Sequence, residues 1–564
     1  MNGDQQRQKW FERFPELFAK QTEILKSSGF ALDAKMVQEQ GRIQFVGSSK
    51  VDPARQLIVA FPEAFPSSAP KISDTPASKL LPRHHRVDTR QLCLFGFNEK
   101  RWSANRSVAD ALAEAEELIA KFKTGNATRE NEPPEPLTRA IVYVPGAAIL
   151  VPPPISTFTG FAELKSTTGR LRGKFLHGEN KKLQTSGRGI ILEAEFGVEK
   201  RTCSHPFSDY FKNNGEEIRG DWFYLQDPPT QESLPEVLKQ CFQRARAFKK
   251  ADFFWLTLIF KEETGAGGQS RLTWLTARAN DRGQIHTIRT FPYIQQERYV
   301  RIPGLEGLEE RRVLLVGCGS LGSKIGANLA ASGLNRFRLV DDDYFEPNNS
   351  VRHELGVESF GINKEQALLH RLASLNPAVA GNSKCFNFHV GGVNPFATEQ
   401  LFYDLVKDSD LIIDATGVHS VSRFLNELSF ELRIPLLAAW VTNGAWSGEI
   451  VGVVPGKTPC YLCWLDQHYE NVPVSAPDPA GELFAPGCDQ PTFTGTTYDL
   501  GIVAGLATSM CVEMLLPQRE QADFAKNYIR WSSKDENGKP SFSTQRLSTN
   551  AHRECWCRDP QHGV

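Results

Sequence analysis

The sequence predicts an α/β Rossmann-like domain in the C-terminal half, an α+β domain at the N-terminus and an α+β bridging domain between them. A chain of 564 residues is too long for one core and favours about three to four domains. Residues 313–326 (VLLVGCGSLGSKIG) join an apolar strand-like run, a glycine-rich turn and small residues at helical spacing. Residues 9–125 place short strand-like runs between two amphipathic helices, which favours an α+β fold.

The composition excludes several classes of protein. The formal net charge of −1 gives no overall basic field for nucleic acid. No apolar run reaches the length of a membrane span, and the charged, glutamine-rich start (MNGDQQRQKW) differs from a signal peptide. We therefore expect a cytoplasmic protein that binds neither nucleic acid nor membrane. In a reducing compartment, the eleven cysteines are expected to be metal ligands, nucleophiles or core residues rather than disulfides.

The glycine-rich turn predicts a nucleotide site. Gly317, Gly319 and Gly322 have the G-x-G-x-x-G spacing, which lets the backbone approach a phosphate while the following helix presents its free N–H groups. A second strand, 337–340 (FRLV), ends in Asp341, about 20 residues past the glycines, where a ribose-binding acid is expected. This spacing alone also fits a dehydrogenase.

The residues after the second strand favour adenylation over hydride transfer. They form a polar cluster: Asp341, Asp343, Asn349, Arg352 and Lys364. Hydride transfer does not need such a cluster, whereas adenylation must hold the β- and γ-phosphates of ATP and their metal while a carboxylate attacks the α-phosphate. Residues 298–564 here resemble the ubiquitin-activating superfamily, which includes the bacterial molybdopterin- and thiamin-pathway adenylyltransferases. The resemblance implies that the glycines and Asp341 bind adenosine and phosphates, that Asn349, Arg352 and Lys364 bind the triphosphate, and that ATP and Mg²⁺ are used.

Two positions of the resemblance need comment. In the superfamily a later strand ends in two acids three residues apart, but here Asp414 is followed by Gly417 at the second position, so either Asp414 or Asp343 is expected to take the metal role. Arg301, in the pattern R-Y-x-R, matches an arginine that activating enzymes lend to the ATP site, often across a homodimer. The alternative for Arg301 is a surface or helix-capping arginine.

The N-terminal region carries a second resemblance. A helix at 9–26 precedes strand-like runs and a proline-punctuated stretch (IVAFPEAFPSSAPKI), and Cys93 follows in L-C-L with Trp102 nine residues later and a closing helix from Ser107. This order resembles a ubiquitin-conjugating enzyme, which implies that Cys93 is the thioester cysteine. A thiolate suits that role because it is both a strong nucleophile and a good leaving group. The alternative is that Cys93 is a small core residue.

The histidine loop departs from the conjugating-enzyme pattern. The His-Pro-Asn tripeptide is missing, and His85 stands eight residues before Cys93, where the asparagine is usual. Either His84 or His85 could donate a hydrogen bond to the oxyanion that forms when an amine attacks a thioester. Both could equally be exposed loop residues.

The cysteines of the C-terminal half fall into two groups. Cys460 and Cys463 form a C-x₂-C pair, and Cys555 with Cys557 near the end could complete four thiolates around structural zinc, unless His552 replaces one of them. Reduced thiols without metal are the alternative. Cys488 lies in a Pro/Gly-rich stretch that resembles the loop carrying the transfer cysteine of activating enzymes.

The predicted domains are a conjugating-type domain at 1–125, a bridging domain at 139–297 and an adenylation domain at 298–564. Together they resemble the activating–conjugating fusion proteins of bacterial anti-phage CBASS operons. That resemblance implies adenylation of a protein C-terminus, in those relatives a cGAS-like nucleotidyltransferase, followed by thioesters on Cys488 and Cys93 and ligation to an amine such as lysine. The alternatives are an NAD-dependent oxidoreductase, a sulfur-carrier adenylyltransferase and a non-enzymatic scaffold.

Overall fold

The computed structural model divides the chain into two compact units, Met1–Tyr293 and Ile294–Val564. It describes residues 8–40, 42–76, 78, 90–94, 102–103, 105–124, 137–139, 141–177, 187–203, 211, 215–230, 233–245, 253–263, 270–280, 283–293, 301–390, 399–442, 444–471, 494–520, 522–535 and 537–558. Within the first unit, two sheets have separate hydrophobic cores, and each is described by itself.

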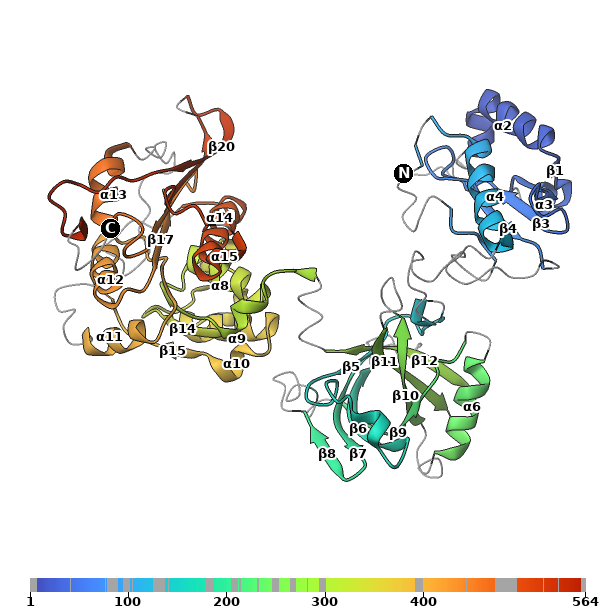
Figure 1. Cartoon of the computed structure of the whole chain (residues 1–564), viewed down its shortest axis with the longest axis horizontal. Helices are drawn as coiled ribbons and strands as arrows, with labels where there is room; N and C mark the ends of the chain where they lie inside the picture. Colours follow the sequence, from blue (N-terminus) through green and yellow to red (C-terminus); the bar gives the residue numbers. More distant parts are fainter. Residues whose placement is uncertain are drawn as a thin grey trace. The chain divides into compact units, whose positions relative to one another are not determined.

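The N-terminal part is a small antiparallel sheet packed against helices (Figure 1). Its strands follow one another in the order β1 (Ala31–Leu32), β2 (Gln44–Ser48), β3 (Gln56–Ala60) and β4 (Lys71–Asp74). Its helices are α1 (Trp10–Arg13), α2 (Pro15–Ser27), α3 (Ala34–Gln40) and α4 (Val108–Thr124). Strands β2 and β3 alternate buried and half-buried residues, so that Phe45, Leu57 and Val59 face the core and meet Ala111 and Ala115 of α4. The predicted opening and closing helices therefore both form.

The middle part is a closed β-barrel, which is more β-rich than the α+β domain expected there. Its strands are β5 (Ala147–Val151), β6 (Thr168–His177), β7 (Gly187–Phe196), β8 (Glu199–Thr202), β9 (Glu216–Leu225), β10 (Phe253–Glu263), β11 (Ser270–Asn280) and β12 (Ile285–Pro292). They pair in the order β5-β12-β11-β10-β9-β6-β7-β8, and β5 also pairs with β7, which closes the sheet. Helix α6 (Leu234–Arg244) packs on β10 and β11, so that these two strands are buried on both faces.

The C-terminal unit is a doubly wound α/β fold, as predicted. Its strands are β13 (Arg312–Val316), β14 (Arg336–Val340), β15 (Lys384–Phe386), β16 (Leu411–Asp414), β17 (Leu436–Val441), β18 (Ser447–Val453), β19 (Tyr528–Lys534) and β20 (Pro540–Leu547). They form one sheet in the order β15-β14-β13-β16-β17-β18-β19-β20, parallel from β15 to β17 and antiparallel beyond. Because the chain runs from β13 to one side and then returns to β16 on the other, the strand order reverses between β13 and β16. A ligand crevice is expected there, at the carboxyl ends of the strands.

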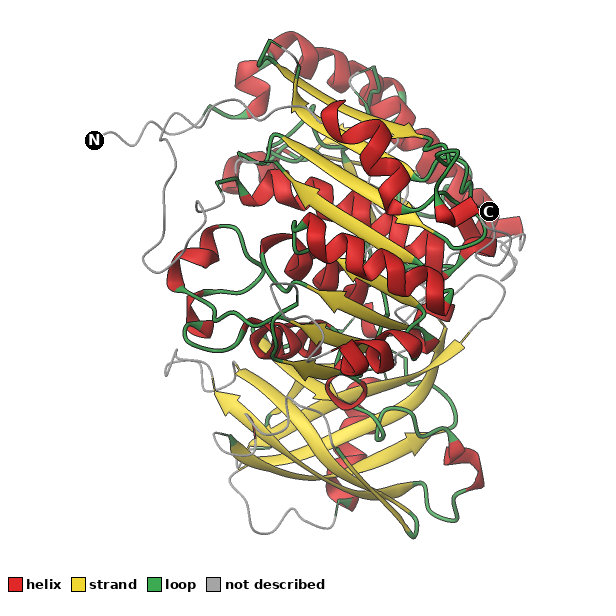
Figure 2. Cartoon of the chain, turned by 90° about the vertical axis from the view of Figure 1, so that its left-hand side faces the viewer, coloured by secondary structure: helices red, strands yellow, loops and turns green. Residues whose placement is uncertain are grey.

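Helices cover both faces of this sheet (Figure 2). They are α8 (Ser320–Ala331), α9 (Lys364–Leu375), α10 (Val379–Asn382), α11 (Glu399–Lys407), α12 (His419–Leu432), α13 (Tyr461–His468), α14 (Thr497–Leu515) and α15 (Pro517–Glu520). One core joins the sheet to α8, α9 and α14, and the other joins it to α11, α12 and α13. Within the described residues, α14 alone is long and apolar enough to cross a membrane, but 67% of its apolar window is buried inside the domain. It is a core helix here.

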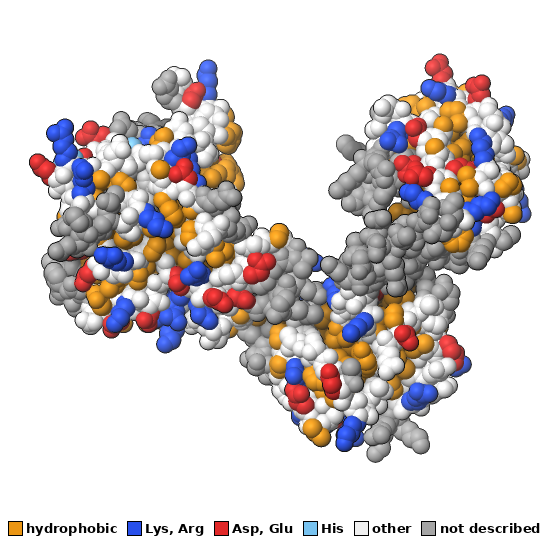
Figure 3. All heavy atoms as spheres, viewed as in Figure 1, with side chains coloured by type: hydrophobic (Ala, Val, Ile, Leu, Met, Phe, Trp, Pro, Cys, Tyr) orange, Lys and Arg blue, Asp and Glu red, His pale blue; other side chains and the backbone are white. Residues whose placement is uncertain are grey.

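Charged side chains of both signs are mixed on the face that Figure 3 shows, among the described residues. This distribution agrees with the formal net charge of −1. The described residues on that face form no broad basic surface of the kind that nucleic acid requires.

Candidate functional site

A cavity of about 280 Å³ opens where the strand order reverses. Its polar lining comes from the loops after β13, β14, β15 and β16 and from the first turn of α9: Gly317, Gly319, Asp341, Asp342, Asp343, Lys364, His389 and Thr416. Its apolar lining includes Val316, Val340, Phe388, Val390, Val418 and Val421. The structure therefore brings two of the three predicted glycines and three of the predicted nucleotide-binding side chains to one cavity.

The glycine loop needs glycine for steric reasons. Gly317 has φ +88°, and a Cβ on it would lie 2.9 Å from the backbone of residues 415–416. A Cβ on Gly322 would lie 1.9 Å from the carbonyl oxygen of Gly317, because α8 begins close against the strand. Gly319, by contrast, has open space where a side chain would be. Gly319 also lines the cavity, where no side chain stands between a ligand and the backbone N–H groups.

Asp341 fastens the glycine loop to the next strand. Its Oδ2 accepts a hydrogen bond from the backbone N–H of Cys318 at 2.6 Å, and its Oδ1 accepts one from the N–H of Asp343 at 3.0 Å. Burial raises the pKa of Asp341, and the two backbone N–H groups partly offset that shift. The carboxyl group lies at the end of β14, where the sequence predicts the ribose-binding acid.

Of the residues predicted to bind the triphosphate, Lys364 lines the cavity, whereas Arg352 and Asn349 lie outside its lining. Lys364 forms an ion pair with Asp343, and its backbone N–H donates to the Asp343 carbonyl at 2.9 Å, so both charges line the cavity. Arg352 donates from Nε to Ser320 Oγ at 3.1 Å, at the first residue of α8, and burial lowers the pKa of its guanidinium. The Asn349 side chain accepts from the Glu346 N–H at 3.1 Å and caps a short 3₁₀ turn. Asn349 is therefore turned to a local cap rather than to the cavity lining.

Asp414 is buried and already hydrogen-bonded. Its side chain is 1% exposed; Ser422 Oγ donates to Oδ2 at 2.6 Å, and Thr416 donates to Oδ1 from its N–H at 3.0 Å and from Oγ1 at 2.7 Å. Burial raises its pKa. The neighbours Ala415 and Thr416 line the cavity, whereas Asp414 Oδ2 meets Ser422 of α12 and its Oδ1 meets Thr416. Of the two acids considered for the metal, Asp343 is the one that faces the cavity.

His353 supports the glycine loop, and sequence reasoning missed it. Its Nε2–H donates to the Cys318 carbonyl at 2.8 Å, and its Nδ1 accepts from the Leu355 N–H at 3.2 Å, which fixes one neutral tautomer. Burial lowers the pKa of His353 to about 4. A lone histidine in SVRHELG carries no spacing signal, so only the fold could reveal this contact.

The depressed pKa of His353 makes the C-terminal unit sensitive to acid. An unfolded histidine with a pKa near 6.5 takes up a proton before the folded one does, so stability falls as the pH drops from about 6.5 to about 4, by about 3 kcal/mol. Thermal unfolding across this range should show the loss. His353→Gln keeps a donor for the Cys318 carbonyl but cannot titrate. The stability of this variant should therefore fall by about 3 kcal/mol less than that of the unchanged protein over the same pH range. Equal slopes for the two proteins would contradict the assignment.

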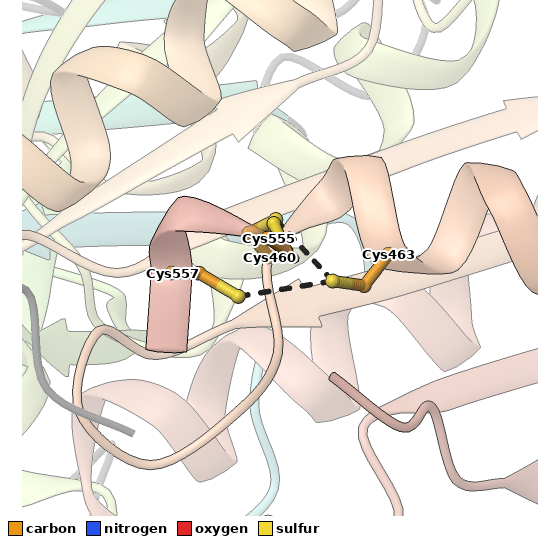
Figure 4. Close-up of side chains that lie close together, drawn as sticks. All are labelled: Cys460, Cys463, Cys555 and Cys557. Carbon is orange, nitrogen blue, oxygen red and sulfur yellow. Dashed lines mark hydrogen bonds between the residues drawn. The ribbon is translucent and has the colours of Figure 1, made fainter. Parts of the chain in front are cut away.

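Four cysteine thiols gather between α13 and the C-terminal segment (Figure 4). The sulfurs of Cys460, Cys463, Cys555 and Cys557 all lie within 4.8 Å of one another. Three sulfur–sulfur distances are 3.8 Å (Cys460–Cys463), 3.5 Å (Cys460–Cys555) and 3.7 Å (Cys463–Cys557). Tetrahedral zinc with Zn–S bonds of about 2.3 Å requires sulfurs about 3.8 Å apart, so the arrangement fits zinc.

The set of candidate ligands is four thiols, without His552. The backbone N–H of His552 donates to Cys463 Sγ at 3.3 Å, and its Nδ1 accepts from the Glu554 N–H at 3.4 Å. The pKa of the Cys463 thiol is lowered, first by the hydrogen bond from Cys460 and also by the His552 N–H. The thiolate is the form of cysteine that binds metal, so a lowered pKa favours metal binding. Zinc bound here would link α13 to the C-terminal segment, because Cys460 and Cys555 are 95 residues apart in the sequence.

Cys93 lies beside the N-terminal sheet. Leu92 donates its N–H to the Ile72 carbonyl at 2.8 Å, and Gln91 bridges to Ser73, so this segment extends the edge of the sheet at β4. Leu92 is 1% exposed and Leu94 8%, whereas Cys93 between them is half-buried. Alternation along an extended chain thus turns Cys93 away from the core that its neighbours enter.

The remaining predicted residues are placed as follows. Arg301 is exposed at the start of the C-terminal unit. Cys488, His84 and His85 lie outside the described residues. The segment that carries Cys488 is followed by Thr494, whose carbonyl accepts from the Gly444 N–H at 2.7 Å, between β17 and β18. Trp102 donates from Nε1 to the Pro66 carbonyl at 2.9 Å in the N-terminal part.

Comparison with known proteins defines the class of the C-terminal unit. Residues 293–557 match the model of the ThiF family. The sulfur carrier protein ThiS adenylyltransferase of Bacillus subtilis is 30% identical over 31% of this chain and 50% of its own length. The C-terminal region therefore has the ThiF/MoeB-like fold of the ATP-dependent, E1-like adenylating enzymes.

Two further relatives match different shares of the chain. The ATP-dependent ubiquitin transferase-like protein Cap2 of Escherichia coli is 28% identical over 37% of this chain and 34% of its own length, so the match spans about a third of that protein. The predicted resemblance to this class of ubiquitin transferase-like proteins is confirmed over that part of the chain. Uncharacterized protein y4oA of Sinorhizobium fredii is 25% identical over 97% of both chains.

Proposed function

We propose that this protein uses ATP to adenylate the C-terminal carboxylate of another protein, transfers the acyl group through Cys488 and Cys93, and joins it to an amine. The observation that carries the proposal is the cavity of the ThiF-type unit. It combines a glycine loop open at Gly319, an acid at the end of β14 and the Lys364–Asp343 pair at one edge of the sheet. These groups suit a nucleoside triphosphate better than a nicotinamide cofactor, since the latter has no γ-phosphate for Lys364 to meet.

In the proposed adenylation step, the chain's own groups bind and orient the triphosphate. The N–H groups around Gly319 bind the phosphates, Asp341 binds the ribose, and Lys364 and Arg352, which contacts the first residue of α8, bind the β- and γ-phosphates. Asn349 reaches the triphosphate only if it gives up its cap on Glu346. Arg301 acts at the ATP site of a second copy, in a homodimer.

Asp343 is the residue proposed to hold Mg²⁺. It is an exposed carboxylate that lines the cavity, and carboxylate oxygens are the ligands Mg²⁺ prefers, while the buried Asp414 already accepts three hydrogen bonds. When bound, the ion neutralises charge on the β- and γ-phosphates. The Lys364 ammonium that now pairs with Asp343 is then available to the phosphates.

The proposed cycle has four bond exchanges. A carboxylate oxygen attacks the α-phosphorus, and the bond to the β-phosphate breaks with release of pyrophosphate. The Cys488 thiolate attacks the acyl carbon and AMP leaves; the Cys93 thiolate then takes the acyl group and frees Cys488. An amine nitrogen attacks the second thioester, loses a proton and releases Cys93, with His84 or His85 proposed to donate to the oxyanion.

The half-buried position of Cys93 supports its role as the second carrier. A core cysteine would enter the cluster that Leu92 and Leu94 enter, but Cys93 points away from it. The resemblance to Cap2 supports a CBASS setting in anti-phage defence, with a cGAS-like nucleotidyltransferase as donor of the carboxylate, a lysine or similar amine as acceptor, and the cytoplasm as location. A sulfur-carrier adenylyltransferase, the second candidate, would leave the first unit, Met1–Tyr293, without a role.

Trapping of the two thioesters tests this proposal. The full chain is incubated with ATP and a candidate donor protein and analysed on non-reducing gels. Cys93→Ala should keep a thiol-sensitive adduct on Cys488 but form no amide conjugate, and Cys488→Ala should form neither. Cys241→Ala, which changes a buried cysteine of the barrel domain, is the matched control and should behave as the unchanged protein. Conjugates that persist in Cys93→Ala would favour a scaffold role for the N-terminal part.

A further inference from the structure

The strand order fixes the direction in which a nucleotide lies in the cavity. At the carboxyl edge of the sheet the neighbours are β15, β14, β13 and β16, and adjacent strands are about 4.8 Å apart. The glycine loop follows β13 and leads into α8, which presents N–H groups to phosphate. Asp341 follows β14, one strand away, and residues 388–390 follow β15, two strands away. A ribose at Asp341 therefore directs its base towards residues 388–390.

The segment after β15 presents two different faces. Phe388 and Val390 pack against the core beside α11, and the Phe388 ring meets the Phe402 ring edge-on at 5.2 Å. The alternate side chains, those of Asn387 and His389, turn the other way, to the loop after β14. Asn387 Nδ2 donates to the Asp341 carbonyl at 3.3 Å, and His389 Nδ1 lies 2.7 Å from Asp342 Oδ2. His389 and Asp342 both line the cavity, at the end where the base is expected.

We propose that His389, oriented by Asp342, is a specificity-determining residue that selects a 6-amino purine over a 6-oxo purine. A carboxylate can only accept, so the proton on this side of the ring is on Nδ1, and in the neutral imidazole Nε2 is then an acceptor. The 6-amino group of adenine donates to such an acceptor. The 6-oxo group of hypoxanthine or guanine is itself an acceptor and cannot donate to Nε2, so this hydrogen bond is lost.

Apolar side chains complete the lining of the cavity. Phe388 and Val390 flank His389, whereas Val418 and Val421 follow β16, on the other side of β13. Apolar contacts cover any purine alike and do not distinguish between substituents at position 6. Discrimination at position 6 therefore depends on the His389–Asp342 pair.

The inference rests on the proposed function, and direct binding tests it separately from turnover. Calorimetric titration of the full chain with ATP and with ITP, which carries a 6-oxo group, gives the ratio of the two affinities. The unchanged protein should bind ATP about tenfold more tightly than ITP, the factor expected of one hydrogen bond. His389→Ala should weaken ATP binding about tenfold and ITP binding little, so that the ratio approaches one. Asp342→Ala should lower the ratio in the same direction.

Lys364→Ala is the control for this experiment, because a residue that meets phosphates should weaken ATP and ITP equally. An unchanged preference for ATP in His389→Ala would overturn the role of His389 while leaving the ATP site intact. Equal affinity of the unchanged protein for ATP and ITP would overturn it as well. Failure of the unchanged protein to bind either nucleotide would instead overturn the proposed function.

Discussion

Lys364→Ala is expected to lower ATP–pyrophosphate exchange by about 10²- to 10³-fold, the range seen when one preorganised charge or donor is removed from a transition state. Lys364 is held at the start of α9 by Asp343, through both its side chain and its backbone N–H, and it lines the cavity. Truncation removes the positive charge that would meet the departing pyrophosphate. Labelled pyrophosphate incorporated into ATP gives the rate.

A lysine on the same unit serves as the control for that measurement. Lys407, at the end of α11, is exposed and does not line the cavity, so Lys407→Ala should keep the full exchange rate. Thermal unfolding of both variants should match the unchanged protein, since neither side chain is part of a core. Full exchange in Lys364→Ala would show that the triphosphate is held elsewhere.

Loss of the four-thiol site is expected to destabilise the C-terminal unit strongly. The cluster joins the first turn of α13 to the segment after β20, and Trp464 on α13 packs against Tyr528 of β19 and Trp440 of β17. Structural zinc contributes apparent free energies of order 10 kcal/mol in small domains, and a loss of even about 3 kcal/mol would lower the Tm of a unit this size by roughly 10 °C. Cys463→Ser should show that decrease.

Metal analysis separates a zinc site from a packing effect. The purified chain should carry about one zinc ion, and Cys463→Ser should carry much less, because a structural site needs all four ligands. Cys241→Ser, which also changes a buried cysteine, should keep its zinc. A chain without zinc, whose Tm does not respond to Cys463→Ser, would favour reduced thiols.

The parts of the site that the sequence predicted are those set by local spacing. The glycine turn, the acid that ends the next strand and the C-x₂-C pair each depend on residues a few positions apart or on one strand–helix unit. That Cys460 lies close to Cys555 could be predicted only from chemistry, because two short cysteine pairs are typical of a zinc site.

The parts that the sequence could not predict depend on contacts between distant segments. Asp414 ends the buried strand β16 and accepts a hydrogen bond from Ser422 on the next helix, and no spacing rule predicts that contact. His389 meets Asp342 only because β15 pairs beside β14. The barrel closes through the pairing of β5 with β7. Alternating apolar and polar residues predict strands but do not show which strands pair. Local residue patterns therefore predict which side chains bind a nucleotide, whereas the side chains around them are known only from the topology of the sheet.

Adenylation of a protein C-terminus is best tested by ATP–pyrophosphate exchange with the unchanged full chain, with and without a donor protein that has a free C-terminal carboxylate. Exchange should depend on the donor, disappear when the donor's last residues are removed and fall by about 10²- to 10³-fold in Lys364→Ala. A chain that binds ATP but exchanges no pyrophosphate with any donor, whatever its C-terminus, would contradict the proposed adenylation.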